Sequence, residues 1–146
     1  MVCEDGSEYL ERFTRFLDEE FEFTPAGDAA ALVGAIAGAT GVILDLDFRR
    51  TPPERLVDES GATSGQLAEP ERRRLSESQG ILILRALRSR KLAVPVLLCA
   101  DLDEDQVAWL ERELAPLEVV PSHEGLLETA ARMRALAVRS DLTRDA

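Results

Sequence analysis

The sequence predicts an α/β fold, in which five parallel strands form a doubly wound sheet with helices on both faces. Residues 41–47, Gly-Val-Ile-Leu-Asp-Leu-Asp, form a nearly continuous apolar run, which is typical of a strand buried on both faces. Residues 94–100 form a second run of this kind. Between the expected strands apolar residues recur at helical spacing, and this alternation of strand and helix predicts a parallel sheet.

The strands are expected at residues 1–3, 21–24, 41–47, 94–100 and 117–121. Amphipathic patterns predict helices at 7–20, 29–37, 79–91, 105–114 and 124–138. Ser7 and Asp28 stand where N-cap residues are expected. Pro25 and Gly27 predict the end of the second strand, and Pro95 lies at the start of the fourth, where a proline costs least.

The segment between the third strand and the third helix is unusually long. Residues 51–53 and 60–65 have the composition of loops, residues 54–58 suit one helical turn, and residues 69–75 suit the start of a charged helix. Connections of this length are generally functional or disordered. We therefore expect one domain over residues 1–140, with an insertion at about 49–77 and a frayed tail at 141–146.

The acidic composition disfavours several kinds of partner, although keeping a small protein soluble explains it equally well. The 146 residues suit one domain, and the 28 acidic and 17 basic residues give a net charge of −11. This charge disfavours nucleic acid and anionic membranes, and favours basic proteins or metal cations. No apolar run approaches the roughly 20 residues that cross a bilayer, and no signal-peptide pattern opens the chain. Cys3 and Cys99 are isolated in apolar stretches, so we expect reduced core thiols in a cytoplasmic protein.

Acidic residues lie where two of the expected strands end. Glu4 and Asp5 follow the first strand, and Asp45 and Asp47 end the third. Ligands of open α/β sheets bind at the carboxyl ends of the strands. Asp45 and Asp47 are therefore candidates for chemistry at that edge of the sheet.

In the order and spacing of several short motifs, nearly the whole chain resembles the receiver domain of bacterial response regulators. The motifs are Glu4-Asp5, Asp45, Asp47, the helix opening Gln79-Gly80, Val94-Pro95-Val96-Leu97-Leu98 and Val120-Pro121. The resemblance implies a flavodoxin-like sheet in the order 2-1-3-4-5. It also implies that Asp45 is the position of the phosphate-accepting aspartate, and that Glu4, Asp5, Asp45 and Asp47 hold Mg²⁺.

The chain departs from this family at three positions of the phosphoryl switch. Ala100 stands where a Thr or Ser is expected, Val120 where a Lys is expected, and Leu117 near the place of the switching aromatic residue. Each charge-assisted hydrogen bond missing from such a site is worth roughly 1.5–3 kcal/mol. The resemblance therefore implies a pseudo-receiver, which keeps the fold and has lost the switch.

These observations predict a stand-alone signalling domain that is not an enzyme, requires no cofactor, and acts on a protein partner as adaptor or inhibitor. Neither nucleic acid nor a membrane is expected as a partner, and a homodimer is left open. The candidate partner-binding residues are Thr51, Pro52, Pro53, Arg72, Arg73 and Trp109.

Two other functions remain as alternatives. The first is a working phospho-receiver that accepts phosphoryl on Asp45 with Mg²⁺. The second is a phosphohydrolase of the haloacid-dehalogenase type, which Asp45-x-Asp47 resembles. That class requires a lysine after the fourth strand, whereas Lys91 is the only lysine of the chain and precedes it. His123, the only histidine, is read as a capping or surface residue.

Overall fold

The structure is a computed structural model that describes residues 1–63 and 65–144. Its five parallel strands form one sheet in the order β2-β1-β3-β4-β5, so the predicted fold class and strand order are confirmed. The strands are β1 (Val2–Cys3), β2 (Pro25–Ala26), β3 (Val42–Asp45), β4 (Val96–Cys99) and β5 (Leu117–Val120).

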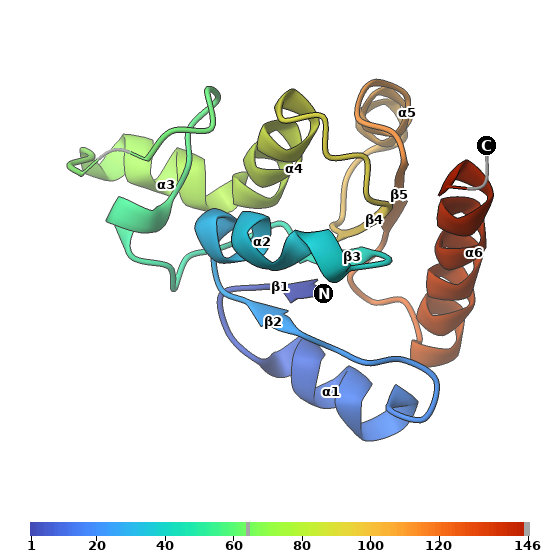
Figure 1. Cartoon of the computed structure of the whole chain (residues 1–146). Coiled ribbons are helices and arrows are strands. Elements are labelled where there is room, and N and C mark those ends of the chain that lie inside the picture. The colour runs from blue at the N-terminus through green and yellow to red at the C-terminus, as the bar shows by residue number, and fades with distance from the viewer. Residues whose placement is uncertain (64, 145–146) are drawn as a thin grey trace.

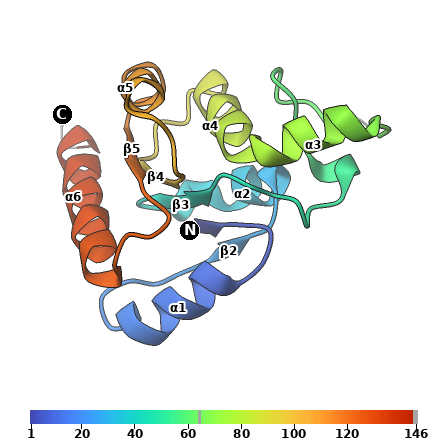
Figure 2. The ribbon, with the colours of Figure 1, turned by 180° about the vertical axis from the view of Figure 1, so that it is seen from behind.

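Helices cover both faces of the sheet (Figures 1 and 2). One face carries α1 (Glu8–Leu17) and α6 (Leu126–Arg144), and the other carries α2 (Ala29–Ala35), α4 (Gln79–Ser89) and α5 (Glu104–Glu113). Helix α3 (Glu69–Glu77) lies beside α4, and short 3₁₀ helices occur at Ile36–Gly38 and Pro53–Arg55. Within the described part of the chain, no helix is long and apolar enough to cross a membrane.

The central strands are apolar along their whole length because each face of the sheet has its own core. Leu44 and Leu98 point into the core beneath α2, α4 and α5. Their neighbours Ile43 and Leu97 point to the opposite face, where they pack with residues of α1 and α6. This alternation explains why β3 and β4 read as continuous apolar runs.

The second strand was predicted at the wrong residues. The strand pairs with β1 at Pro25 and Ala26, whereas residues 21–24 precede it. Phe23 packs instead against Phe13 of α1, with ring centroids 5.7 Å apart. A proline is acceptable in β2 because this strand lies at the edge of the sheet, where its missing N–H breaks no ladder.

Other boundaries differ by smaller amounts. Strand β3 ends at Asp45, so Asp47 lies in the loop that follows. Helix α6 runs to Arg144 and includes residues 141–144, which were expected to be a tail. Residues 145–146 of that tail and residue 64 of the expected loop lie outside the described residues.

The long 49–77 segment contributes to the core. Leu56, Val57 and Leu75 are buried with residues of α4. The buried Gln79 side chain holds Val57 in place: its Oε1 accepts a hydrogen bond from the Val57 N–H at 2.8 Å, and its Nε2 donates to the Val57 carbonyl at 3.1 Å. Helix α3 agrees with the charged helical start predicted at 69–75.

Candidate functional site at the carboxyl ends of the strands

Asp45 is the centre of the candidate site. It ends β3, lies opposite Cys99 of β4, and its Oδ1 accepts a hydrogen bond from the Leu46 N–H at 2.9 Å. Partial burial, followed by the negative charges of Asp5, Glu4 and Asp47, raises the pKa of Asp45 to about 6, although the Leu46 N–H acts in the opposite direction. The four acids predicted from the sequence are therefore close enough to interact.

Glu4 is buried and acts as the cap of helix α1. Its two carboxylate oxygens accept hydrogen bonds from the N–H groups of Tyr9 (3.1 Å) and Leu10 (2.9 Å). Burial raises the pKa of Glu4, and these two N–H groups oppose the rise. Ser7, the predicted cap, makes no capping hydrogen bond, and its hydroxyl bonds Glu11 instead. A carboxylate at this helix end is favourable because the N–H groups there lack partners within the helix.

The carboxylates of Asp5 and Asp47 each bind an arginine that follows β3. The Asp5 carboxylate accepts hydrogen bonds from the backbone N–H and the guanidinium of Arg50, each at 2.9 Å. The Asp47 carboxylate accepts a hydrogen bond from the backbone N–H of Arg49 at 3.0 Å and pairs with its Nε at 2.7 Å. Each of these acids thus has a donor supplied by the chain.

The acids are not arranged as a shared metal site. Among the residues that the structure describes, no group of three or more His, Cys, Asp or Glu side chains is placed to hold one ion. The physical reason is that Glu4 directs both oxygens at the N-terminus of α1 and Asp5 directs both at Arg50. Mg²⁺ takes oxygen ligands in near-octahedral geometry, usually one or two carboxylates together with waters. In this arrangement the carboxylates of Glu4 and Asp5 face donors of the chain itself and do not fit that ion.

The three positions of the expected switch are apolar and buried. Ala100 follows β4 and donates its N–H to the Val120 carbonyl at 3.0 Å, while the side chains of Val120 and Leu117 lie in the core. Beside Asp45 stands Cys99, which interacts with the Tyr9 hydroxyl, and burial raises the pKa of Cys99 to about 12. The surroundings of Asp45 on β4 and β5 thus supply neither a hydroxyl at Ala100 nor an ammonium at Val120.

Lys91 is remote from Asp45. Helix α4 begins against the end of β3, where the Gly80 N–H donates to the Leu46 carbonyl at 2.9 Å, and Lys91 follows the other end of this helix. A helix of 11 residues is about 16 Å long. The single lysine therefore does not serve the candidate site.

The sequence reasoning missed two residues of this site. Arg50 pairs with Asp5, and its only sequence signal is its position directly after an acidic strand end. Tyr9 lies beside Cys99 and Asp45, and its only sequence signal is its place in the amphipathic pattern of residues 7–20. Side-chain direction across a loop is not encoded in periodicity, so neither contact was predictable.

The predicted partner-binding residues differ in accessibility. Thr51 is buried, which removes it from the surface, and Pro52 and Pro53 are half-buried. Arg72 is bound to Glu69 by two hydrogen bonds of 2.9 Å, whereas Arg73 is exposed beside it. A hollow at this place is lined by Arg49, Glu69, Arg72, Arg73, Ser76 and Glu77.

Trp109 lies on a different surface, between α4 and α5. Its side chain is 42% exposed, and the guanidinium of Arg85 lies 5.5 Å from the ring centroid. Exposed tryptophans are common at the centre of interfaces.

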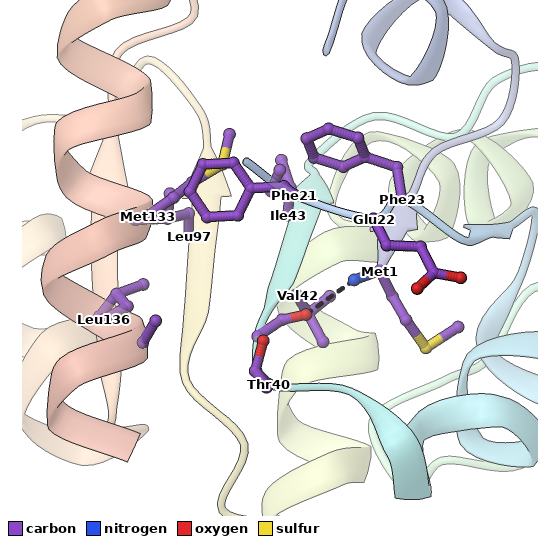
Figure 3. A pocket seen from close by; sticks show the side chains of 12 residues that line it. Met1, Phe21, Glu22, Phe23, Thr40, Val42, Ile43, Leu97, Met133 and Leu136 are labelled. Atoms are coloured by element: carbon purple, nitrogen blue, oxygen red, sulfur yellow. Dashed lines mark hydrogen bonds between the residues drawn. The ribbon is translucent and has the colours of Figure 1, made fainter. Parts of the chain in front are cut away.

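A further hollow lies at the opposite edge of the sheet, at the amino end of β3 (Figure 3). It is lined mainly by apolar side chains, among them Phe21, Leu97 and Met133, and the Met1 ammonium donates to the Gly41 carbonyl at 2.8 Å. Its polar side chains are those of Glu22 and Thr40.

Known proteins resemble this chain in structure. No family model matches it, and no curated protein matches its sequence. The receiver domain of the Francisella response regulator 1452 matches with a TM-score of 0.65 and 15% identity, covering 95% of each chain. The signal receiver domain of a putative Luxo repressor protein from Vibrio parahaemolyticus matches with a TM-score of 0.68 and 12% identity, covering 98% of this chain and 92% of that one.

A third structure, described as an adenylate cyclase from Rhodopirellula baltica, matches with a TM-score of 0.64 and 11% identity, covering 99% of this chain and 90% of that one. Likeness at such low identity shows the fold alone. The chain thus has the fold of a response-regulator receiver domain.

Proposed function

We propose that this receiver-like domain acts in bacterial cytoplasmic signalling through contact with a protein partner, as an adaptor or inhibitor, without a phosphoryl switch and without catalysis. One observation carries the proposal. Around Asp45, the chain presents the buried apolar side chains of Ala100 and Val120 at the positions where a phosphoryl group would need a hydroxyl and an ammonium.

The electrostatics of the site support the same proposal. A phosphoryl group on Asp45 adds roughly two negative charges. Those charges would join Glu4, Asp5 and Asp47, which already raise the pKa of Asp45. Like charges at such short range repel strongly in a partly buried site. Phosphorylation of Asp45, the runner-up function, would therefore be opposed by its surroundings.

The exposed surface of the 49–77 segment is the proposed contact region. Arg73 is exposed at the hollow that Arg49 also lines, where three arginines and two glutamates contrast with the acidic net charge of the chain. Deleting the segment would remove Leu56, Val57 and Leu75 from the core, so a deletion tests folding as well as recognition. Single surface substitutions avoid this problem.

The proposal is tested by capturing the partner from an extract of source cells with immobilised wild type, Arg73→Glu and Asp45→Asn. We expect the captured partner to be retained by Asp45→Asn and reduced several-fold by Arg73→Glu, because only the latter changes the contact surface. Arg90→Glu, an equal charge reversal after the far end of α4, is the control and should bind as wild type does. Loss of the partner in Asp45→Asn, with normal capture by Arg73→Glu, would contradict the proposal.

A further inference from the structure

Arg50 joins two parts of the chain that are far apart in sequence. Its guanidinium donates to Asp5 at 2.9 Å and to both oxygens of Glu8 at 2.6 and 3.0 Å. Its backbone N–H holds the second oxygen of Asp5 at 2.9 Å. The start of the 49–77 segment is thereby tied to the turn between β1 and α1.

The contact with Arg50 compensates for the burial of the Asp5 carboxylate. Only 6% of its side chain is exposed, although the side chain of Arg50 is 57% exposed. A carboxylate with so little solvent requires a positive charge or hydrogen-bond donors nearby. Arg50 supplies both, whereas the neighbouring acids Glu4 and Asp45 supply further negative charge.

The backbone of the turn is shaped to admit the guanidinium. A Cβ atom added at Gly6 would lie 2.5 Å from a terminal nitrogen of Arg50 and 2.5 Å from Glu8 Oε2. The missing side chain at Gly6 therefore lets the Arg50 fork lie close to the turn while it reaches both carboxylates.

We propose that Arg50 is the built-in cation of the acidic site, which supplies from the chain itself the positive charge that a divalent metal ion would otherwise bring. Arg50 occupies both oxygens of Asp5 and leaves the acids without a common set of free ligands. The folded protein is consequently indifferent to Mg²⁺. The inference goes beyond the proposed function, because it concerns what neutralises the site and not what the protein contacts.

The test compares the thermal unfolding midpoints of wild type, Arg50→Gln and Arg55→Gln in EDTA and in millimolar Mg²⁺, with NaCl keeping the ionic strength constant. We expect no response of the wild type to Mg²⁺. Arg50→Gln should unfold about 4 °C lower in EDTA, since Asp5 loses its counter-charge, and should regain part of this loss with Mg²⁺. Arg55→Gln is the control from the same segment, because its ion pair with Asp28 is long, at 3.9 Å.

Gly6→Ala provides a second route to the same state, because the added methyl group displaces the guanidinium while Arg50 itself remains. It should also make the unfolding midpoint respond to Mg²⁺. The inference is overturned if wild type and both site variants respond equally to Mg²⁺, or if none of them responds. Because the readout is stability, failure here leaves the partner-capture result unaffected.

Discussion

At the scale of single residues, three of the four acids at the site bind hydrogen-bond donors that the chain itself supplies. Glu4 caps α1, Asp5 binds Arg50, and Asp47 binds Arg49. Asp45 is the exception, since the hydrogen bond that its Oδ1 accepts is the local one from the Leu46 N–H. It therefore has the least compensation for its partial burial and for the charges around it, which is why its pKa is raised.

This leads to a prediction on pH. The pKa of Asp45 is raised from 3.8 to about 6 in the folded protein, so between these values the folded state holds a proton that the unfolded state has released. The contribution of Asp45 to the free energy of unfolding is fully present below about pH 4, and it is lost as the pH rises through about 6. Asp45→Asn removes the charge and keeps an oxygen that can accept from Leu46.

We therefore expect Asp45→Asn to unfold at a higher temperature than wild type at pH 7, with the difference shrinking as the pH falls from 6 towards 4. This difference in unfolding temperature is measured by following thermal unfolding with circular dichroism at several pH values in this range. A difference that stays constant across the range would show that Asp45 is not held at a raised pKa.

At the scale of elements, the contact between α4 and β3 fixes the site. Helix α4 begins so close to the end of β3 that a Cβ atom at Gly80 would lie 2.2 Å from the Asp45 carbonyl oxygen. The next residue back, Gln79, holds the 49–77 segment through Val57. One helix start therefore positions both the strand that carries Asp45 and the segment that carries Arg50.

Gly80→Ala should lower the free energy of unfolding by about 2–3 kcal/mol, because backbone atoms of β3 must move to admit the methyl group. Gly34→Ala is the matched control: Gly34 lies in helix α2, and no atom is within 4 Å of its added Cβ. This substitution should raise stability by about 0.5 kcal/mol through helix propensity. Equal effects of the two substitutions in urea denaturation would contradict the close contact at Gly80.

The elements also show what the sequence could predict. Strands β3 and β4 were predictable because burial on both faces of the sheet leaves a continuous apolar run in the sequence. The helices were predictable because burial on one face leaves apolar residues at helical spacing. Strand β2 was misplaced because Phe21 and Phe23 alternate as a strand would, while the pairing with β1 falls on Pro25 and Ala26. The choice between them depends on the tertiary position of an edge strand.

At the scale of the whole molecule, the doubly wound sheet brings Glu4, Asp5, Asp45 and Asp47 to one edge, as the sequence predicted from strand order. Their mutual arrangement was not predictable. It depends on Arg49 and Arg50, which lie in a loop, and on the direction that Glu4 takes towards α1. We propose that in this chain arginines of the loop, and not a bound metal ion, neutralise the acidic edge.

Above all, we propose that this edge of the sheet does not take up a phosphoryl group. This proposal is tested most directly by adding Mg²⁺ and beryllofluoride, a mimic of the phosphoryl group, to the folded protein and recording its ¹⁹F NMR spectrum. A phospho-accepting receiver domain is the positive control and Asp45→Asn is the blank. We predict that wild type gives the same spectrum as Asp45→Asn, with no bound resonance. A bound resonance that is present in wild type and absent from Asp45→Asn would contradict the account.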